Sequence, residues 1–282
     1  MASQERSMPF IKNLASSDRK VRTSALASLH AFLSARQVAS TLSPLDILKL
    51  WKGLFYALWM CDRAIPQQTL CAELADLIFF LPRVAVVPWL RGFWATMARE
   101  WTSIDVLRME KFLLLVRRVV GAGFRWMKTT DGRGKQSADE KSWDSEKMGD
   151  IMGLLTEWPF NVEDEVEPSE SLGAEQAALS AQTIPIGLRI HVLDIWVDEA
   201  EKVGLLEEDD KAAKEFVARL VEKVDVLERT TVNPGVRIRA KESLSDERLS
   251  GKKEKEEPVA EAAADTKMAD TGDSGSWDGF ED

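Results

Sequence analysis

Helix-length amphipathic segments follow one another almost without interruption over residues 9–127, and this feature constrains the fold more than any other. In one segment, apolar side chains recur at helical spacing at Val21, Ala25, Leu29 and Phe32. No segment shows the period-two alternation of a half-buried strand. Helices of roughly 15–20 residues joined by short turns favour antiparallel pairs. The sequence therefore predicts an all-α fold. Although no clean repeat period is present, we expect degenerate HEAT-like pairs stacked into an α-solenoid.

Capping residues and prolines mark where these helices begin and end. Residues 43–46, Ser-Pro-Leu-Asp, combine a capping serine, a first-turn proline and an acid at the positive helix end. Pro66 is expected to open the next helix and Pro82 to end it, because proline lacks the donor that a helix interior needs. Pro88 is expected to start a further helix.

The stretch Leu50–Asp62, LWKGLFYALWMCD, is aromatic and nearly free of charge, which suggests a membrane segment, a binding platform or a buried helix. It is too short to span a bilayer, and no other window reaches about 18 uninterrupted apolar residues. A helix that is apolar around most of its surface is central and buried. We therefore expect most of these aromatics to be core. The alternative is that one or two tryptophans form an exposed docking surface, and base stacking on Trp51 or Trp59 is possible in principle, although nothing in the sequence selects it.

Charge is divided unevenly along the chain. Residues 1–130 hold 18 Lys and Arg against 9 Asp and Glu, whereas residues 131–282 hold 19 against 38, so the front carries +9 and the back −19. This division suggests that the basic half meets something anionic, and that the acidic half meets water, basic proteins or the front half itself. The start MASQERSMPF has no apolar core of a secretory signal, and two cysteines are too few for a disulfide scaffold.

A basic stripe is predicted on the helix over residues 104–127, provided that it runs unbroken through Gly121 and Gly123, which would otherwise loosen or end it. The candidate RNA-binding residues are those of this stripe and a second cluster near the N-terminus: Arg108, Lys111, Arg118, Arg125, Arg19, Lys20 and Arg22. Such stripes bind phosphate backbones without base specificity. The alternative is a solvated helix face whose acidic partners lie within the chain.

No constellation of catalytic residues emerges from the sequence. Phosphate-binding glycine loops, metal-ligand spacings and nucleophile motifs are all missing. Asp194, Asp198 and Glu199 are expected to form a solvated helix face, and His191 to pack in or near the core. We therefore expect no enzymatic activity, no catalytic residue, no metal, no cofactor, no small-molecule substrate and no membrane partner.

The chain is expected to divide into a basic helical part over residues 8–127, a polar loop or insertion over 128–149, an acidic helical part of the same solenoid over 150–248, and a disordered acidic tail over 249–282. Within the tail, Trp277 and Phe280 are candidate partner-binding residues, because isolated aromatics in such segments dock into partners. An idle tail is the alternative.

Three long strings of rare residues carry a family resemblance. They are LWKGLFYALWMCDRAIPQQTL, FWATMAREWTSIDVLRMEKFLLLVRRVV and GLRIHVLDIWVDEAEKVG. With them, most of residues 8–205 resembles the eukaryotic nucleolar ribosomal RNA-processing protein 1 family. The polar insertion and the tail lie outside the matching strings, so the resemblance says nothing about their roles.

The resemblance implies a helical, HEAT-like, non-catalytic assembly factor. Such a protein would work in the nucleus, in the nucleolus, on the precursor of the large (60S) ribosomal subunit. It would be required for precursor rRNA processing and would contact precursor rRNA and other assembly factors, among them Brix-domain and WD-repeat proteins. The alternative function is a helical-repeat adaptor that binds only proteins.

Overall fold

The computed structural model describes residues 10–35, 42–129, 143–162, 184–207 and 210–250, and these ranges are predominantly α-helical. The helices are α1 (Phe10–Leu14), α2 (Arg19–Ser34), α4 (Pro44–Trp59), α5 (Ala64–Asp76), α6 (Arg83–Glu100), α7 (Val106–Trp126), α8 (Ser145–Glu157), α10 (Ile186–Val203), α11 (Lys211–Thr230) and α12 (Pro234–Leu244). Short 3₁₀ turns, Leu77–Phe79, Trp101–Ser103 and Glu247–Ser250, follow α5, α6 and α12. All of these elements belong to the unit spanning residues 1–252.

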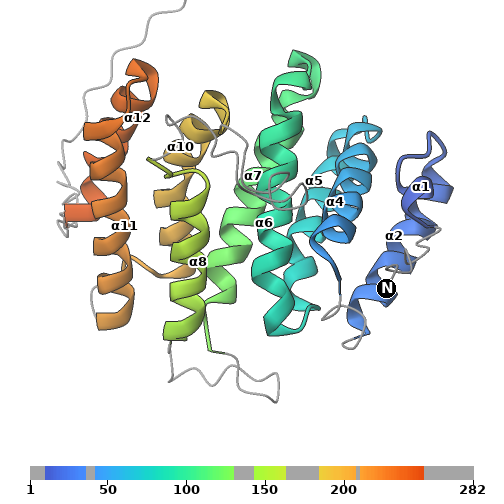
Figure 1. The fold of residues 1–282 in the computed structure, drawn as a ribbon, viewed down its shortest axis with the longest axis horizontal. Helices are drawn as coiled ribbons and strands as arrows, with labels where there is room; N and C mark the ends of the chain where they lie inside the picture. Colours follow the sequence, from blue (N-terminus) through green and yellow to red (C-terminus); the bar gives the residue numbers. More distant parts are fainter. Residues whose placement is uncertain (1–9, 36–41, 130–142, 163–183, 208–209, 251–282) are drawn as a thin grey trace, which may run out of the picture. The chain divides into compact units, whose positions relative to one another are not determined.

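Successive helices alternate between two layers (Figure 1). One layer contains α4, α6, α8 and α11, each packed on the next, and the second contains α5, α7, α10 and α12 in the same order. Contacts of α4 with α5, and of α11 with α12, join the layers, and α1 packs on α4 and α2. The prediction of an all-α fold built from packed helix pairs, solenoid-like, is confirmed.

The helices of the second layer run parallel to one another. Near their beginnings, the ammonium of Lys111 in α7 contacts the turn that precedes α5, and near their ends Arg125 of α7 pairs with Asp76 of α5. His191 of α10 contacts Leu113 of α7 in the same sense. These helices therefore all begin at one edge of the layer, which lies at the top of Figure 1.

The expected capping signals operate in the structure. Ser43 and Asp46 form a reciprocal capping box at the start of α4, with Pro44 at the first helical position. At the other end of a helix, Gly204 ends α10 with a φ of 83°, a left-handed conformation that glycine adopts without steric cost.

Several boundaries differ from the sequence-based expectation. Helix α5 begins at Ala64, two residues before Pro66, and ends at Asp76, where a 3₁₀ turn follows before Pro82. Helix α6 begins at Arg83 and continues through Pro88, which occupies an interior position at the cost of one backbone hydrogen bond. Helix α7 runs through Gly121 and Gly123 to Trp126, and α8 begins at Ser145, five residues before the predicted 150. Its start is set by Asp144, whose carboxylate accepts from the backbone N–H groups of Glu146 and Lys147.

The aromatic stretch in α4 is a buried core helix. Trp51 is 2 % exposed, and its indole N–H donates to the carbonyl of Trp89 in α6 at 2.9 Å. Phe55 stacks on Phe112 of α7 with ring centroids 4.5 Å apart. Throughout the described ranges, every tryptophan is buried or half-buried, and the half-buried Trp59 has the Arg108 guanidinium over its ring. The described part of the chain has no helix with the length and apolar character to cross a membrane.

Candidate functional site

The predicted basic stripe on α7 separates into residues with different surroundings. Asp105 caps the helix, its carboxylate accepting from the Arg108 backbone N–H at 3.1 Å. Because the helix continues through both glycines, Arg108, Arg118 and Arg125 lie along one unbroken element. What each cation contacts then decides which of them can meet an external anion.

Lys111 is buried and its ammonium group is fully engaged inside the protein. The residue is 5 % exposed. Its Nζ donates to the carbonyl oxygens of Trp59 at 2.7 Å and Cys61 at 2.9 Å, and lies 3.8 Å from the carboxylate of Asp62. Burial lowers the pKa of Lys111, and the nearby Asp62 carboxylate opposes that shift. Lys111 thus satisfies the last carbonyls of α4, where a cation is favourable, and is not available to a phosphate.

Arg108 and Arg125 are half-exposed and each has a carboxylate and an aromatic neighbour. The Arg108 guanidinium donates to Asp105 and lies over the Trp59 ring, 4.8 Å from its centroid. Arg125 donates to Asp76 at 2.6 Å and lies 5.2 Å from the centroid of the Phe79 ring. Such pairs hold the side chains in place but leave part of each guanidinium exposed to solvent.

Arg118, Arg19 and Lys20 are the candidates that remain open to solvent. All three are exposed, and none has a carboxylate or ring partner within the described part of the chain. Arg22, beside them, is half-buried and donates to the carbonyls of Ser16 and Ser17 at 2.8 Å, which holds the turn before α2. Arg19 and Lys20 begin α2, whereas Arg118 lies in the middle of α7.

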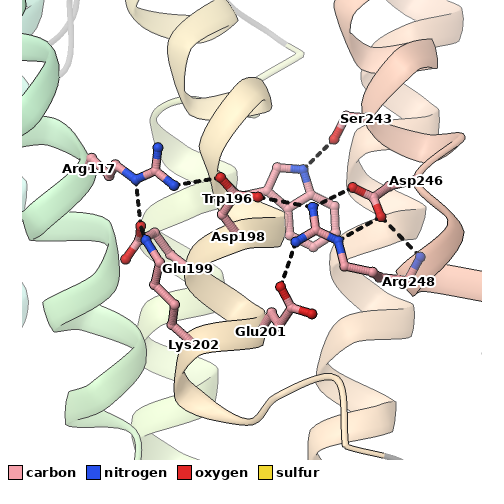
Figure 2. Close-up of polar contacts among 9 residues, drawn as sticks. All are labelled: Arg117, Trp196, Asp198, Glu199, Glu201, Lys202, Ser243, Asp246 and Arg248. Atoms are coloured by element: carbon pink, nitrogen blue, oxygen red, sulfur yellow. Dashed lines mark hydrogen bonds and ion pairs between the residues drawn. The ribbon is translucent and has the colours of Figure 1, made fainter. Parts of the chain in front are cut away.

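Arg117, which is not among the predicted RNA-binding residues, links α7 to α10 (Figure 2). Its Nε donates to Glu199 at 2.7 Å and its Nη2 donates to Asp198 at 2.5 Å, so one guanidinium joins α7 to α10 through two carboxylates. Glu199 is buried, and Lys202 donates to the same carboxylate at 2.6 Å. Sequence reasoning missed this pairing because the partners lie more than 80 positions apart.

Arg248 extends the same network from α10 to the segment after α12 (Figure 2). It donates to Asp198 at 3.0 Å, to Glu201 at 2.7 Å and to Asp246 at 2.7 Å. Burial alone would raise the pKa of Asp198, but the hydrogen bonds from Arg248 and Arg117 outweigh it and hold that pKa below its ordinary value. In the same figure, the buried indole N–H of Trp196 donates to the Ser243 hydroxyl at 2.6 Å.

The remaining ionisable groups of this region also have structural partners. Asp194 pairs with Arg239 at 2.9 Å, although burial raises the pKa of Asp194. The His191 ring lies with its Nε2 2.9 Å from the Leu113 carbonyl, and burial lowers its pKa. Burial raises the pKa of Cys71 to about 12, which leaves the thiol unreactive. Among the described residues, no three His, Cys, Asp or Glu side chains gather as a metal site would require.

Trp277 and Phe280, the candidate partner-binding residues of the tail, lie outside the described residues, as do residues 130–142 of the polar insertion.

Comparison with known proteins decides the family of the chain. The family model described as nucleolar protein, Nop52, matches residues 5–277. The chain belongs to the Nop52 family. The sequence resemblance to the ribosomal RNA-processing protein 1 family is confirmed by this match and by the names of the relatives.

Three curated relatives of this Nop52-family chain come from mammals. Ribosomal RNA processing protein 1 homolog A from Mus musculus is 32% identical over 199 residues, which is 70% of this chain and 34% of the relative. Ribosomal RNA processing protein 1 homolog B from Mus musculus is 30% identical over 72% of this chain and 25% of the relative. Its Homo sapiens counterpart is 30% identical over 72% of this chain and 23% of the relative. The chain therefore matches about a third or less of each relative's length.

The strings that carried the resemblance supply much of the internal framework of this Nop52-family chain. The first string contains Trp51, and also Trp59 and Cys61, whose carbonyls accept from Lys111. The second string contains Lys111 and Arg117. The third contains Asp198 and Glu199, which receive Arg117. The most recognisable residues thus assemble the scaffold, while Arg19 and Lys20 lie outside the strings.

Proposed function

We propose that this chain is a non-catalytic ribosome assembly factor that acts in the nucleolus, in the processing of precursor rRNA and in maturation of the large (60S) subunit precursor. The observation that carries the proposal is the match of the Nop52 model over residues 5–277. Relatives named for ribosomal RNA processing support it. The structure supports a holding role rather than chemistry, because Arg117, Arg248 and their carboxylates are engaged in joining helices.

Contact with precursor rRNA is proposed through the exposed cations. Arg19, Lys20 and Arg118 offer positive charge that no described carboxylate neutralises. Arg108 and Arg125 are secondary candidates, because a surface ion pair contributes only about 0–1 kcal/mol and a phosphate can replace the carboxylate at little cost. Recognition of this kind positions a backbone and carries no base specificity.

The test is affinity purification of the tagged chain, with sequencing of the bound RNA and mass spectrometry of the bound proteins. We expect large-subunit precursor rRNA together with nucleolar assembly factors. Replacing Arg19, Lys20 and Arg118 by glutamate should lower rRNA recovery severalfold without unfolding the protein, because all three side chains are exposed.

A matched control reverses the same number of charges elsewhere. Lys211, Lys214 and Arg219 on α11 are also exposed, so their replacement by glutamate changes net charge equally at a distant position. Equal loss of rRNA in both variants would indicate a general charge effect. Full rRNA recovery by a folded Arg19, Lys20 and Arg118 variant would contradict the proposed RNA surface.

The proposed protein partners are other assembly factors, including the Brix-domain and WD-repeat proteins implied by the family resemblance. A helical-repeat adaptor without RNA contact is the second candidate function, because solenoid-like helix pairs serve both roles. Nuclease treatment of the extract separates the two. A protein-only adaptor keeps every partner once RNA is destroyed, whereas an rRNA-bound factor loses those that it reaches through RNA.

The tail residues Trp277 and Phe280 are proposed as a small docking element for one such partner. Deleting residues 274–282 should then remove one protein from the purified set. An unchanged set of partners would assign no docking role to these aromatics.

A further inference from the structure

Large apolar side chains stand exposed where the helices of the second layer begin. Ile65 of α5 is 79 % exposed, Val106 and Leu107 of α7 are 84 % and 90 % exposed, Ile186 of α10 is 49 % exposed, and Val232, just before α12, is 75 % exposed. Because α5, α7, α10 and α12 are successive neighbours running in parallel, these side chains form a row along one edge. We call these five residues the helix-start edge.

A protein surface rarely leaves so many large apolar groups in line without a partner. Scattered exposed apolar residues are ordinary, but these recur at the same position of four successive helices. They lie in the first turn of α5, α7 and α10, or just before α12. Their exposure shows that these side chains do not pack between the two layers. Packed helices lie roughly 8–10 Å apart, which sets the spacing of the row.

Two exposed arginines lie beside the row, and one of them, Arg237, donates to the Thr231 carbonyl at 2.6 Å. Arg63 precedes Ile65 at one end, and Arg237 lies in the first turn of α12 at the other. Neither has a carboxylate partner among the described residues. Of the acids near this edge, Asp105 accepts from Arg108, while the Asp62 side chain is 80 % exposed and lies 3.8 Å from the Lys111 ammonium. The positive ends of four parallel helices add to the same sign.

We propose that the helix-start edge docks an acidic amphipathic helix of a protein partner, lying across the four helices. A helix rises about 10.5 Å in seven residues, which is close to the roughly 8–10 Å between neighbouring helices of the row. One apolar side chain per seven residues would then contact each helix start, while carboxylates on the flanks face Arg63 and Arg237. About 22 residues of partner helix span the edge from α5 to α12.

The docking proposal depends on the proposed function in one respect, because the scaffold role is the reason for assigning the helix-start edge to a protein partner. It involves different residues from the proposed RNA contacts. A peptide-binding measurement contains no rRNA, so failure of the docking proposal and failure of the rRNA proposal are separate results.

The test uses the full chain with methyl-labelled Ile, Val and Leu, and an alanine-based peptide of about 22 residues with leucine at every seventh position and glutamate on the opposite face. A matched peptide carries lysine in place of each glutamate. We expect the acidic peptide to shift the methyl signals of Ile65, Val106, Leu107 and Ile186, and the basic peptide to bind about tenfold more weakly or worse.

Substitutions at the helix-start edge test whether the acidic peptide binds there. Leu107→Glu should weaken binding of the acidic peptide about tenfold or more, and Ile65→Glu provides a second variant at another helix. Val84→Glu is the control, because Val84 is 71 % exposed at the start of α6, on the opposite edge. Thermal melting checks that each variant folds.

Several results would overturn the proposal. Absence of binding, equal binding of the two peptides, or shifts confined to methyl groups away from the edge would each do so. An oligouridylate that shifts the same methyl signals more strongly than the acidic peptide would assign the edge to nucleic acid instead.

Discussion

Lys111 shows how the same residue supports opposite interpretations at the two levels of description. On a helical wheel it joins Arg108 and Arg118 in a basic arc, which favours a phosphate-binding stripe. In the structure that part of α7 faces the end of α4, whose carbonyls need donors. A wheel gives the angle between side chains, but it cannot say where a neighbouring helix ends. Burial of Lys111 was therefore beyond what the sequence could predict.

Replacing Lys111 by methionine should destabilise the fold by about 2–4 kcal/mol, because the carbonyls of Trp59 and Cys61 lose a charged donor in a buried position. Urea denaturation followed by tryptophan fluorescence measures the change. Lys52→Met on α4 is the control, since Lys52 is exposed and should change stability by less than about 0.5 kcal/mol. Equal effects of the two changes would show that Lys111 has no special structural role.

His191 should make stability depend on pH in the mildly acidic range. Burial lowers its pKa below the ordinary 6.5, with Asp194 favouring and Arg117 opposing the charged form. As pH falls below 6.5, the unfolded chain takes up a proton before the folded chain does, so stability falls until the pH passes the folded pKa. His191→Gln should flatten the profile between neutral pH and about pH 5.

At the scale of elements, short-range sequence patterns predicted helix starts better than any pattern predicted which helices become neighbours. The capping box at Ser43 and Asp46 follows from short-range chemistry and occurs as expected. Pro88 did not start a helix as expected, because the packing of the many buried residues of α6 tolerates one missing hydrogen bond. The link from Arg117 to Asp198 depends on which helices become neighbours, and no local pattern contains that information.

Gly121 and Gly123 in α7 offer a matched pair of changes. A Cβ at Gly121 would lie 2.5 Å from the Glu199 carboxylate, so alanine there must displace the partner of Arg117. We expect Gly121→Ala to destabilise the protein by about 1–3 kcal/mol despite its better helix propensity. At Gly123 the nearest atom would be Ile151 Cδ1 at 3.4 Å, an ordinary contact, and alanine should be neutral or stabilising by up to about 1 kcal/mol. Thermal or urea unfolding compares them, and the reverse order would contradict this reading of α7.

At the scale of the whole unit, the two layers make each helix depend mainly on its neighbours. Helix α10 contacts α7 on one side and α12 on the other, and the ion pairs of Arg117 and Arg248 follow the same order. In such a stacked arrangement stability is approximately a sum of local terms. Sequence reasoning anticipated the stacking of pairs but not the network that joins α7, α10 and α12, because its members come from segments far apart in the chain.

Ser243→Ala tests this local dependence. The change removes the acceptor of the Trp196 indole N–H and leaves a buried donor unsatisfied, which should cost about 1–3 kcal/mol at the α10–α12 contact. Native-state hydrogen exchange should then become about 5- to 150-fold faster at amides of α11 and α12, while amides of α4 and α6 keep their protection, because α12 packs mainly on α10 and α11. If α4 and α6 lost protection to the same extent, the described helices would unfold as one cooperative block, and the nearest-neighbour account of this scaffold would be wrong.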